Sequence, residues 1–227
     1  MPLKAIEKIL DTRNDLSDYL FHFTKREDGK QTLEKILGDE KLIASEKSKY
    51  ICFTEAPLHS MTDMFNHFSQ YKNPMYAPYG VAILKEDIYD LGGRHVIYGP
   101  NSDLEFIDST IHWRFEEYDP TTKDFTWLRE WRVREDFIEL DAARIFVITK
   151  LIQEEDDMSK EEGEIDIDGC VSDGQFWPSY YLTVERKWSC ISLERLIADS
   201  LNTRIAISEN LDNQQIGELE YLYLGSG

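Results

Sequence analysis

The chain has 227 residues, of which 41% are hydrophobic and 30% are charged, a composition that supports one packed domain rather than two. Its formal net charge of −19 disfavours general binding to nucleic-acid phosphates or anionic membranes, because such binding depends on clustered lysine and arginine. No apolar stretch approaches the roughly 20 residues that cross a bilayer, so a soluble protein is expected.

The first segment, MPLKAIEKIL, has the pattern of a short amphipathic helix and lacks the apolar run and cleavage site of a secretory signal. We therefore expect a cytoplasmic location. Cys52, Cys170 and Cys190 are widely spaced and form no CxxC pair. The sequence thus predicts neither a disulfide framework nor a cysteine-based zinc site.

The stretch DYLFHFT (18–24) alternates as a strand does, which places His22 and Thr24 on one face and apolar side chains on the other. Taken alone, a buried histidine bonded to a backbone carbonyl explains this pattern as well as a ligand-binding histidine does. A helix is predicted over TLEKILGDEKL (32–42), because leucine and isoleucine recur at helical spacing and a glycine lies near the end.

The middle of the chain predicts further strands separated by turns. KYICFTEAPL is a strand that ends at Pro57, and residues 58–71 follow as a helix or an irregular lid. Proline and tyrosine mark NPMYAPYG as a loop. YGVAILKEDI is then a strand that leads into a turn, and the glycine pair of LGGRHVIYGP introduces another strand. Residues 103–118 are expected to be helical.

TWLREWRVRE (126–135) and RIFVITKLI are predicted to be two adjacent strands. Alternation places Glu130, Arg132 and Arg134 on one face of the first of them. A glutamate held between arginines is a candidate catalytic carboxylate. An ion-pair ladder along an exposed strand explains the same pattern equally well.

The run EEDDMSKEEGEIDID (154–168) has nine acidic residues and one lysine, a composition typical of a solvated loop. The chain is therefore divided into a core over 1–150, an acidic loop over 151–170, and strands and helices over 171–224 that complete the same domain, including a last helix over 213–224. Residues 225–227 are a tail. The elements together predict a mixed, mostly antiparallel α+β fold.

In this order, LFHFT, the TLEKIL helix, ICFTEAPL, YGVAILK, HVIYG and DFTWLREWRV resemble the AbiGi-type abortive-infection family. That family in turn resembles the DarT-like ADP-ribosyltransferases, and the resemblance covers residues 19–150. It implies a split, mostly antiparallel β-core of ADP-ribosyltransferase type with flanking helices. It also implies bound NAD and a triad of histidine, an aromatic or hydroxyl residue, and glutamate.

Carried onto this sequence, the resemblance implies Glu130 as the catalytic carboxylate and His22 as a ligand of the NAD ribose. Thr54 and Tyr79 both fit the middle position of the triad. The pyrophosphate needs a cation, and guanidinium gives a bidentate fit to phosphate. The implied NAD contacts are His22, Phe23, Thr24, Thr54, Tyr79, Arg94 and Arg132, with Arg114 and Lys85 as further phosphate candidates, and no metal is implied.

Cleavage of the nicotinamide–ribose bond builds positive charge on the sugar, which a carboxylate stabilises. The resemblance therefore implies an NAD-dependent mono-ADP-ribosyltransferase of bacterial anti-phage or toxin–antitoxin defence. Its acceptor is a macromolecule, nucleic acid or protein, or it is free water, as in an NAD glycohydrolase, and a cognate toxin or antitoxin protein is a further implied partner. A nucleic-acid acceptor requires a basic groove, for which Arg129 and Arg134 are rim candidates.

Three other functions compete with this one. The first is a non-catalytic antitoxin or partner-binding module that keeps the transferase-like fold and uses its acidic surface to hold a basic partner. The second is a metal hydrolase, although the sequence has no HExxH helix and no close histidine pair. The third is a thiol enzyme that uses Cys52 with His95, although a strand cysteine of this kind is usually buried and inert.

Overall fold

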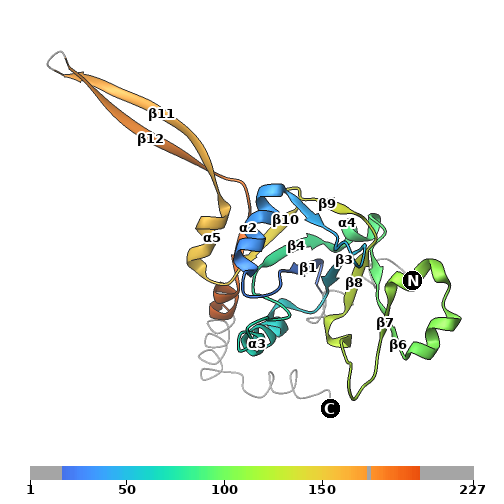
Figure 1. Ribbon diagram of the computed structural model, residues 1–227. Coiled ribbons are helices and arrows are strands. Elements are labelled where there is room, and N and C mark those ends of the chain that lie inside the picture. The colour runs from blue at the N-terminus through green and yellow to red at the C-terminus, as the bar shows by residue number, and fades with distance from the viewer. Residues whose placement is uncertain (1–16, 173–174, 200–227) are drawn as a thin grey trace, which may run out of the picture.

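The computed structural model describes residues 17–172 and 175–199. Its body is a mixed α/β fold built around a seven-stranded, mostly antiparallel sheet with the strand order β13-β10-β4-β1-β3-β8-β5 (Figure 1). Helices flank this sheet, so the predicted combination of a mostly antiparallel sheet with helices is confirmed. The described ranges contain no helix with the length and apolarity that a bilayer span requires.

The elements follow the chain in short alternation. The strands of the large sheet are β1 (Tyr19–Phe23), β3 (Ile51–Thr54), β4 (Gly80–Leu84), β5 (Arg94–His95), β8 (Glu130–Val133), β10 (Ile145–Thr149) and β13 (Cys190–Ser192). The smaller pairs are β2 (Lys41–Ile43) with β9 (Phe137–Glu139) and β6 (Ile97–Gly99) with β7 (Phe115–Glu117). The α-helices with both ends in the described ranges are α2 (Gly29–Asp39), α3 (Leu58–Phe68), α4 (Lys85–Asp90) and α5 (Ile152–Ser159), and residues 193–199 are also helical. The helices expected over 1–10 and 213–224 and the tail lie outside the described residues.

The sheet is covered on both faces, and β1 contributes to both cores. Leu20 packs in one cluster with Leu33 of α2, whereas Phe21 packs in the other with Met61 of α3. Successive strand residues point to opposite faces, so the alternation read from the sequence is what divides β1 between two cores. Each fully buried side chain of this size contributes about 1.5–3 kcal/mol.

The strand β1 is fully paired on one side and barely paired on the other. It pairs with β4 along its whole length, where Gly80 lies opposite Phe23. A Cβ added to Gly80 would lie 2.2 Å from the carbonyl oxygen of His22, so only glycine allows this approach. With β3, by contrast, the register is the single pair Phe21 and Thr54. Beyond that pair the two strands separate.

The expectation that the strands of TWLREWRVRE and RIFVITKLI are neighbours is wrong. The first becomes β8, which pairs with β3 and β5, and the second becomes β10, which pairs with β4 and β13. Between them β9 pairs with β2 in a separate sheet. This detour carries the chain from one half of the large sheet to the other.

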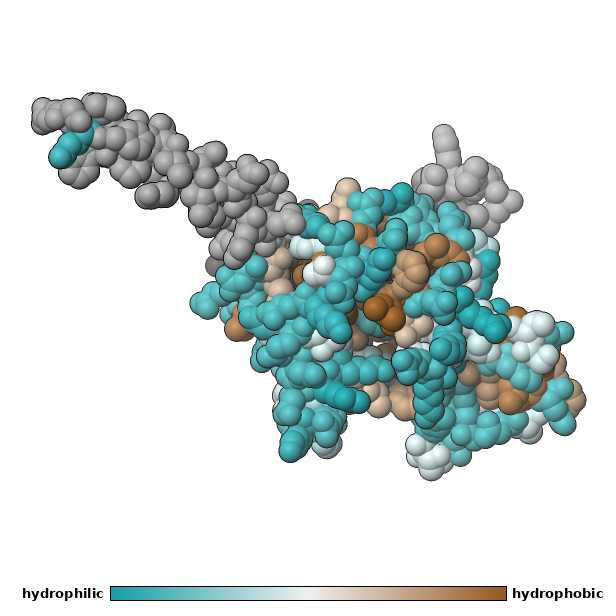
Figure 2. Space-filling model, turned by 45° about the horizontal axis from the view of Figure 1, so that its top comes forward, coloured by the Kyte–Doolittle hydropathy of each residue, from teal (hydrophilic) through white to brown (hydrophobic). Residues whose placement is uncertain are grey.

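The expected helix over 103–118 is also wrong in type. The segment forms two short 3₁₀ helices, η1 (Asn101–Phe106) and η2 (Ser109–Arg114), followed by β7. Asp108 separates them, because its side chain accepts the backbone N–H of Thr110 and starts a new turn. We call residues 101–117 the η1–β7 segment. Phe106 in this segment is 82% exposed, and Figure 2 shows apolar side chains on it, at the right of the view.

The expected acidic loop over 151–170 instead forms α5 and most of a strand, β11 (Lys160–Ser172). β11 pairs antiparallel with β12 (Gln175–Arg186). The hairpin projects from the body of the fold (Figure 1). The charge of the run suggested a loop, but its partner sequence, QFWPSYYLTVER, is rich in the aromatic and β-branched residues that favour strands.

Candidate functional site

A cleft of about 630 Å³ opens where β1 and β3 separate. Its walls come from β1 and the residues that follow it, from β3, and from β8. His22 of β1 and Glu130 of β8 both line this cleft. The structure therefore brings together the two side chains, 108 positions apart in the chain, on which the predicted site depends.

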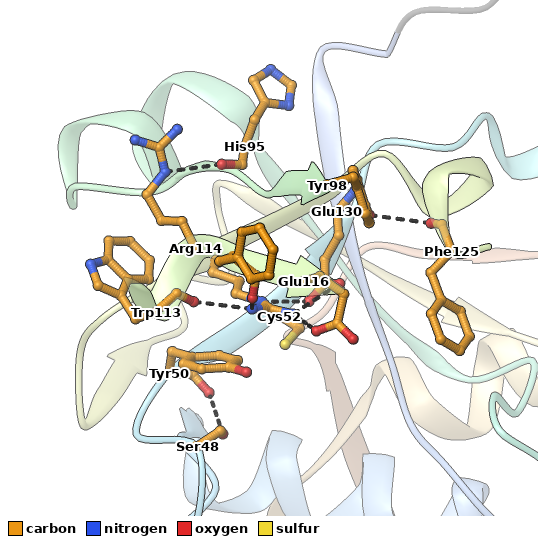
Figure 3. A network of polar contacts seen from close by, with 12 residues as sticks. Ser48, Tyr50, Cys52, His95, Tyr98, Trp113, Arg114, Glu116, Phe125 and Glu130 are labelled. Atoms are coloured by element: carbon orange, nitrogen blue, oxygen red, sulfur yellow. Dashed lines mark hydrogen bonds and ion pairs between the residues drawn. The ribbon is translucent and has the colours of Figure 1, made fainter. Parts of the chain in front are cut away.

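Arg132 holds Glu130 in place. Its side chain is only 4% exposed, and its Nε donates to Oε1 of Glu130 at 2.9 Å (Figure 3). Nη1 donates to the carbonyl oxygens of Trp113 and Phe115, both at 3.0 Å. Nη2 donates to Oε2 of Glu116 at 2.7 Å and to Oε2 of Glu130 at 3.4 Å. Every N–H group of the guanidinium is thus engaged, and Arg132 orients the carboxylate rather than offering donors to a phosphate.

The charges of this cluster stabilise one another. Burial lowers the pKa of Arg132, but hydrogen bonds and charge from Glu130 and Glu116 outweigh burial and raise it. Burial raises the pKa of Glu116, but Arg132 and Lys123 outweigh it and lower that pKa. The aromatic ring of Tyr50 lies 4.6 Å from the guanidinium carbon of Arg132. The guanidinium is therefore permanently charged and shared between two carboxylates.

The imidazole of His22 reaches across the gap between β1 and β3. Its Nδ1 lies 2.8 Å from the carbonyl oxygen of Cys52, and because a carbonyl only accepts, Nδ1 carries the hydrogen. Burial lowers the pKa of His22 below its ordinary 6.5 and outweighs the raising effect of this bond. The ring is therefore neutral near pH 7, and Nε2 is a hydrogen-bond acceptor.

Cys52 lies between the two predicted functional residues. Its carbonyl accepts from His22, and its thiol is hydrogen-bonded to Glu130. Burial and the charge of Glu130 raise the pKa of the Cys52 thiol to about 12. Thiolate is the reactive form of cysteine, so this thiol is unreactive. His95, its suggested base, lies on β5 near Glu55 and does not line the cleft.

Phe23, Thr24 and Thr54 also line the cleft. The hydroxyl of Thr24 donates to the carbonyl of Tyr79 at 3.0 Å, and the hydroxyl of Thr54 donates to the carbonyl of Leu128. Their protons are therefore committed to the backbone. Each oxygen can still accept a hydrogen bond from a ligand, although that of Thr54 already accepts the backbone N–H of Ala56 at 3.1 Å.

The structure does not bring Tyr79 and Arg94 to the cleft. The hydroxyl of Tyr79 donates to Oε1 of Glu154 at 3.1 Å and its ring lines a different cavity. The guanidinium of Arg94 lies 4.0 Å from the ring centroid of Tyr89 and donates to nearby backbone carbonyls. The further phosphate candidates Arg114 and Lys85 are likewise not among the residues that line the cleft.

Sequence reasoning missed Tyr76, Lys25, Arg26 and Glu116, all of which line the cleft. Burial and the nearby charge of Glu130 raise the pKa of Tyr76. Tyr76 belongs to the same loop, NPMYAPYG, as Tyr79, so the loop was identified but not the ring that faces the cleft. The basic pair Lys25 and Arg26 directly follows LFHFT. Its position next to the predicted ribose ligand was the signal for a phosphate-binding cation.

Within residues 17–172 and 175–199, no three histidine, cysteine, aspartate or glutamate side chains gather as metal ligands do. No protein family, curated protein or solved structure gave a significant match to this chain.

Proposed function

We propose that this protein is an NAD-dependent mono-ADP-ribosyltransferase and that Glu130 is its catalytic carboxylate. One observation supports this proposal above the others: His22 and Glu130 line the same cleft, at the place where β1 and β3 separate. A cleft between diverging strands agrees with the split β-core that the resemblance to AbiGi-type and DarT-like proteins implies. The proposed setting is the bacterial cytoplasm, in anti-phage or toxin–antitoxin defence.

In the proposed reaction the bond between the nicotinamide nitrogen and the ribose carbon breaks, and its electron pair leaves with neutral nicotinamide. A nucleophile of the acceptor then bonds to the ribose carbon and loses a proton. Positive charge develops on the sugar between these events, and the carboxylate of Glu130 stabilises that charge. Arg132 holds this carboxylate oriented before the substrate arrives.

The other cleft residues have roles consistent with their hydrogen bonding. Neutral His22 accepts a hydrogen bond from a ribose hydroxyl at Nε2, because its Nδ1 already donates to Cys52. Thr24 and Thr54 offer acceptor oxygens nearby. Tyr76, rather than Tyr79, supplies the aromatic face for nicotinamide, since only Tyr76 of the two lines the cleft.

The test incubates the purified full chain with NAD labelled in its adenosine part, together with DNA, RNA and a cell lysate, and follows the label. Glu130→Gln keeps the size of the side chain and removes its charge. We expect it to lower label transfer by about a hundredfold or more. Glu135→Gln is the matched control, because Glu135 is exposed just beyond β8 and does not line the cleft.

Full activity of Glu130→Gln would exclude the proposed role of this residue. A protein that neither transfers label, nor releases nicotinamide, nor gains thermal stability from NAD would instead favour the non-catalytic partner-binding function. A ligand that binds only the folded state raises the melting temperature. A thermal-shift titration therefore separates NAD binding from NAD turnover.

A further inference from the structure

A second cavity, of about 720 Å³, lies beside the cleft. It is lined by the C-terminal half of α3, the loop over 69–79 and the helical residues 193–199. Arg26 and Tyr76 line both this cavity and the cleft of His22 and Glu130. The two spaces therefore share a wall, and one extended ligand can contact both.

The second cavity gathers cations that have no acidic partner among the described residues. Arg26, Lys72 and Lys150 line it, and none of them forms an ion pair with a residue in the described ranges. The chain has 44 acidic residues and only 25 basic ones, so unpaired cations at one place are unexpected. Two acidic residues, Glu27 and Glu194, also line the cavity, so cations outnumber them by three to two, and Glu194 accepts the backbone N–H of Ile152 at 2.9 Å. The cavity thus favours an anionic ligand.

Aromatic and apolar surface accompanies these cations. Tyr71 is 56% exposed and lines the cavity together with Tyr76 and Tyr79. Leu193 and Ile197 line the same cavity. Tyrosine rings offer flat faces for a planar base, and lysine and arginine bind phosphate. A nucleotide combines these two chemical features in one ligand.

The backbone at the shared wall is also unusual. Arg26 has a φ of 68°, a left-handed conformation that residues other than glycine rarely adopt. Its N–H donates to the carbonyl of Pro74 at 3.0 Å, which ties the end of β1 to the tyrosine-rich loop. Such strain is typical of ligand-binding positions. Lys25, which lines the first cleft only, has its ammonium 5.8 Å from the ring centroid of Tyr76.

We infer that the second cavity binds the adenosine 5′-phosphate part of a nucleotide, with its phosphate held at Arg26 and Lys72. This inference rests on the proposed function only in the choice of nucleotide, the NAD molecule whose reactive ribose lies in the first cleft. The dinucleotide then extends from Glu130 past Arg26 into the cavity lined by Tyr71. Arg26, rather than Arg94 and Arg132 as expected from the sequence, then binds the phosphate.

The experiment measures binding of AMP to the full chain by calorimetry, because AMP lacks the reactive ribose. Asn66→Trp places a bulky ring in the cavity from an exposed position on α3, and Lys72→Gln removes a charge. We expect each to weaken AMP binding by about tenfold or more. Lys35→Gln removes an exposed charge that lines neither cavity and serves as the control.

Unchanged AMP binding in both Asn66→Trp and Lys72→Gln would overturn the inference, as would no AMP binding to the folded wild-type chain. The proposed function fails separately. If the wild type binds AMP in the way expected but never cleaves NAD, the cavity assignment stands and the transferase proposal falls. If NAD is cleaved and Asn66→Trp leaves its KM unchanged, the cavity assignment falls alone.

Discussion

The guanidinium of Arg132 donates to the carboxylate of Glu130 at 2.9 Å, two residues earlier on the same strand. Side chains two apart on a strand share a face, so β8 itself brings the pair together. Nη2 of the same guanidinium donates to Glu116 of β7 at 2.7 Å. The conformation of Glu130 therefore depends on the η1–β7 segment (101–117), which lies outside the main sheet.

Replacing Arg132 with methionine should destabilise the protein by about 3–5 kcal/mol, because it leaves the partly buried Glu130 without its cation and Glu116 with Lys123 alone. Urea unfolding followed by circular dichroism measures this change. Adding Glu116→Gln to Arg132→Met should restore part of the loss, since it removes one of the two negative charges that Arg132 neutralises. Additive effects of the two substitutions would show that Arg132 and Glu116 do not act as a pair.

His22 should titrate below its ordinary pKa of 6.5, because burial disfavours the charged ring more than the bond to Cys52 favours it. The unfolded chain then takes up a proton first as the pH falls. The contribution of His22 therefore lowers the free energy of unfolding as the pH falls from 6.5 toward the pKa of the folded state. Above pH 6.5 the free energy of unfolding does not depend on the protonation of His22. NMR titration of the imidazole protons measures the midpoint, and a value above 6.5 would contradict the buried, neutral ring.

The thiol of Cys52 should react far more slowly with iodoacetamide than an unhindered cysteine does at about pH 8. Burial and the charge of Glu130 raise its pKa to about 12, so almost no thiolate is present. Mass spectrometry of peptides from the native protein quantifies the modification, with the urea-unfolded protein as the reference. Rapid labelling of Cys52 in the native state would place the thiol in a more polar site than the structure does.

Glu155 should stabilise the protein in a pH-dependent way. Hydrogen bonds from Arg195 and Ser192 outweigh the effect of burial and lower the pKa of the Glu155 carboxyl from 4.5 to about 2. The stabilisation is complete above 4.5 and disappears as the pH falls toward 2. The difference in urea midpoint between wild type and Glu155→Gln should therefore be largest near neutral pH and shrink in acid. A difference that does not change with pH would exclude this ion pair as its source.

Local alternation predicted the strands that carry the site, because the side-chain period of a strand is a property of a few consecutive residues. LFHFT became β1 and REWRV became β8, with His22 and Glu130 in one cleft. The loop NPMYAPYG was also predicted, but proximity in sequence did not tell Tyr76 from Tyr79. That choice is made by tertiary contacts, since Tyr79 bonds to Glu154.

Strand order was the least predictable part of the fold. Nothing in TWLREWRVRE or RIFVITKLI indicates that β9 leaves the main sheet to pair with β2. The sequence around Glu116 did not predict its hydrogen bond with Arg132 either, because that contact depends on how the segment after η1 and η2 packs against β8. The acidic run was mistaken for a loop because composition reports solvation and not pairing, which its partner strand decides.

The central place of β1 in the large sheet also bears on biosynthesis. Among the described strands β1 leaves the ribosome first, and its two edges remain unpaired until β3 and β4 have been synthesised. All strands that line the cleft are synthesised once Val133 has emerged, whereas β13 joins its parallel neighbour β10 only after the long hairpin has been made. A nascent chain would thus assemble its cleft before its outer edge is closed.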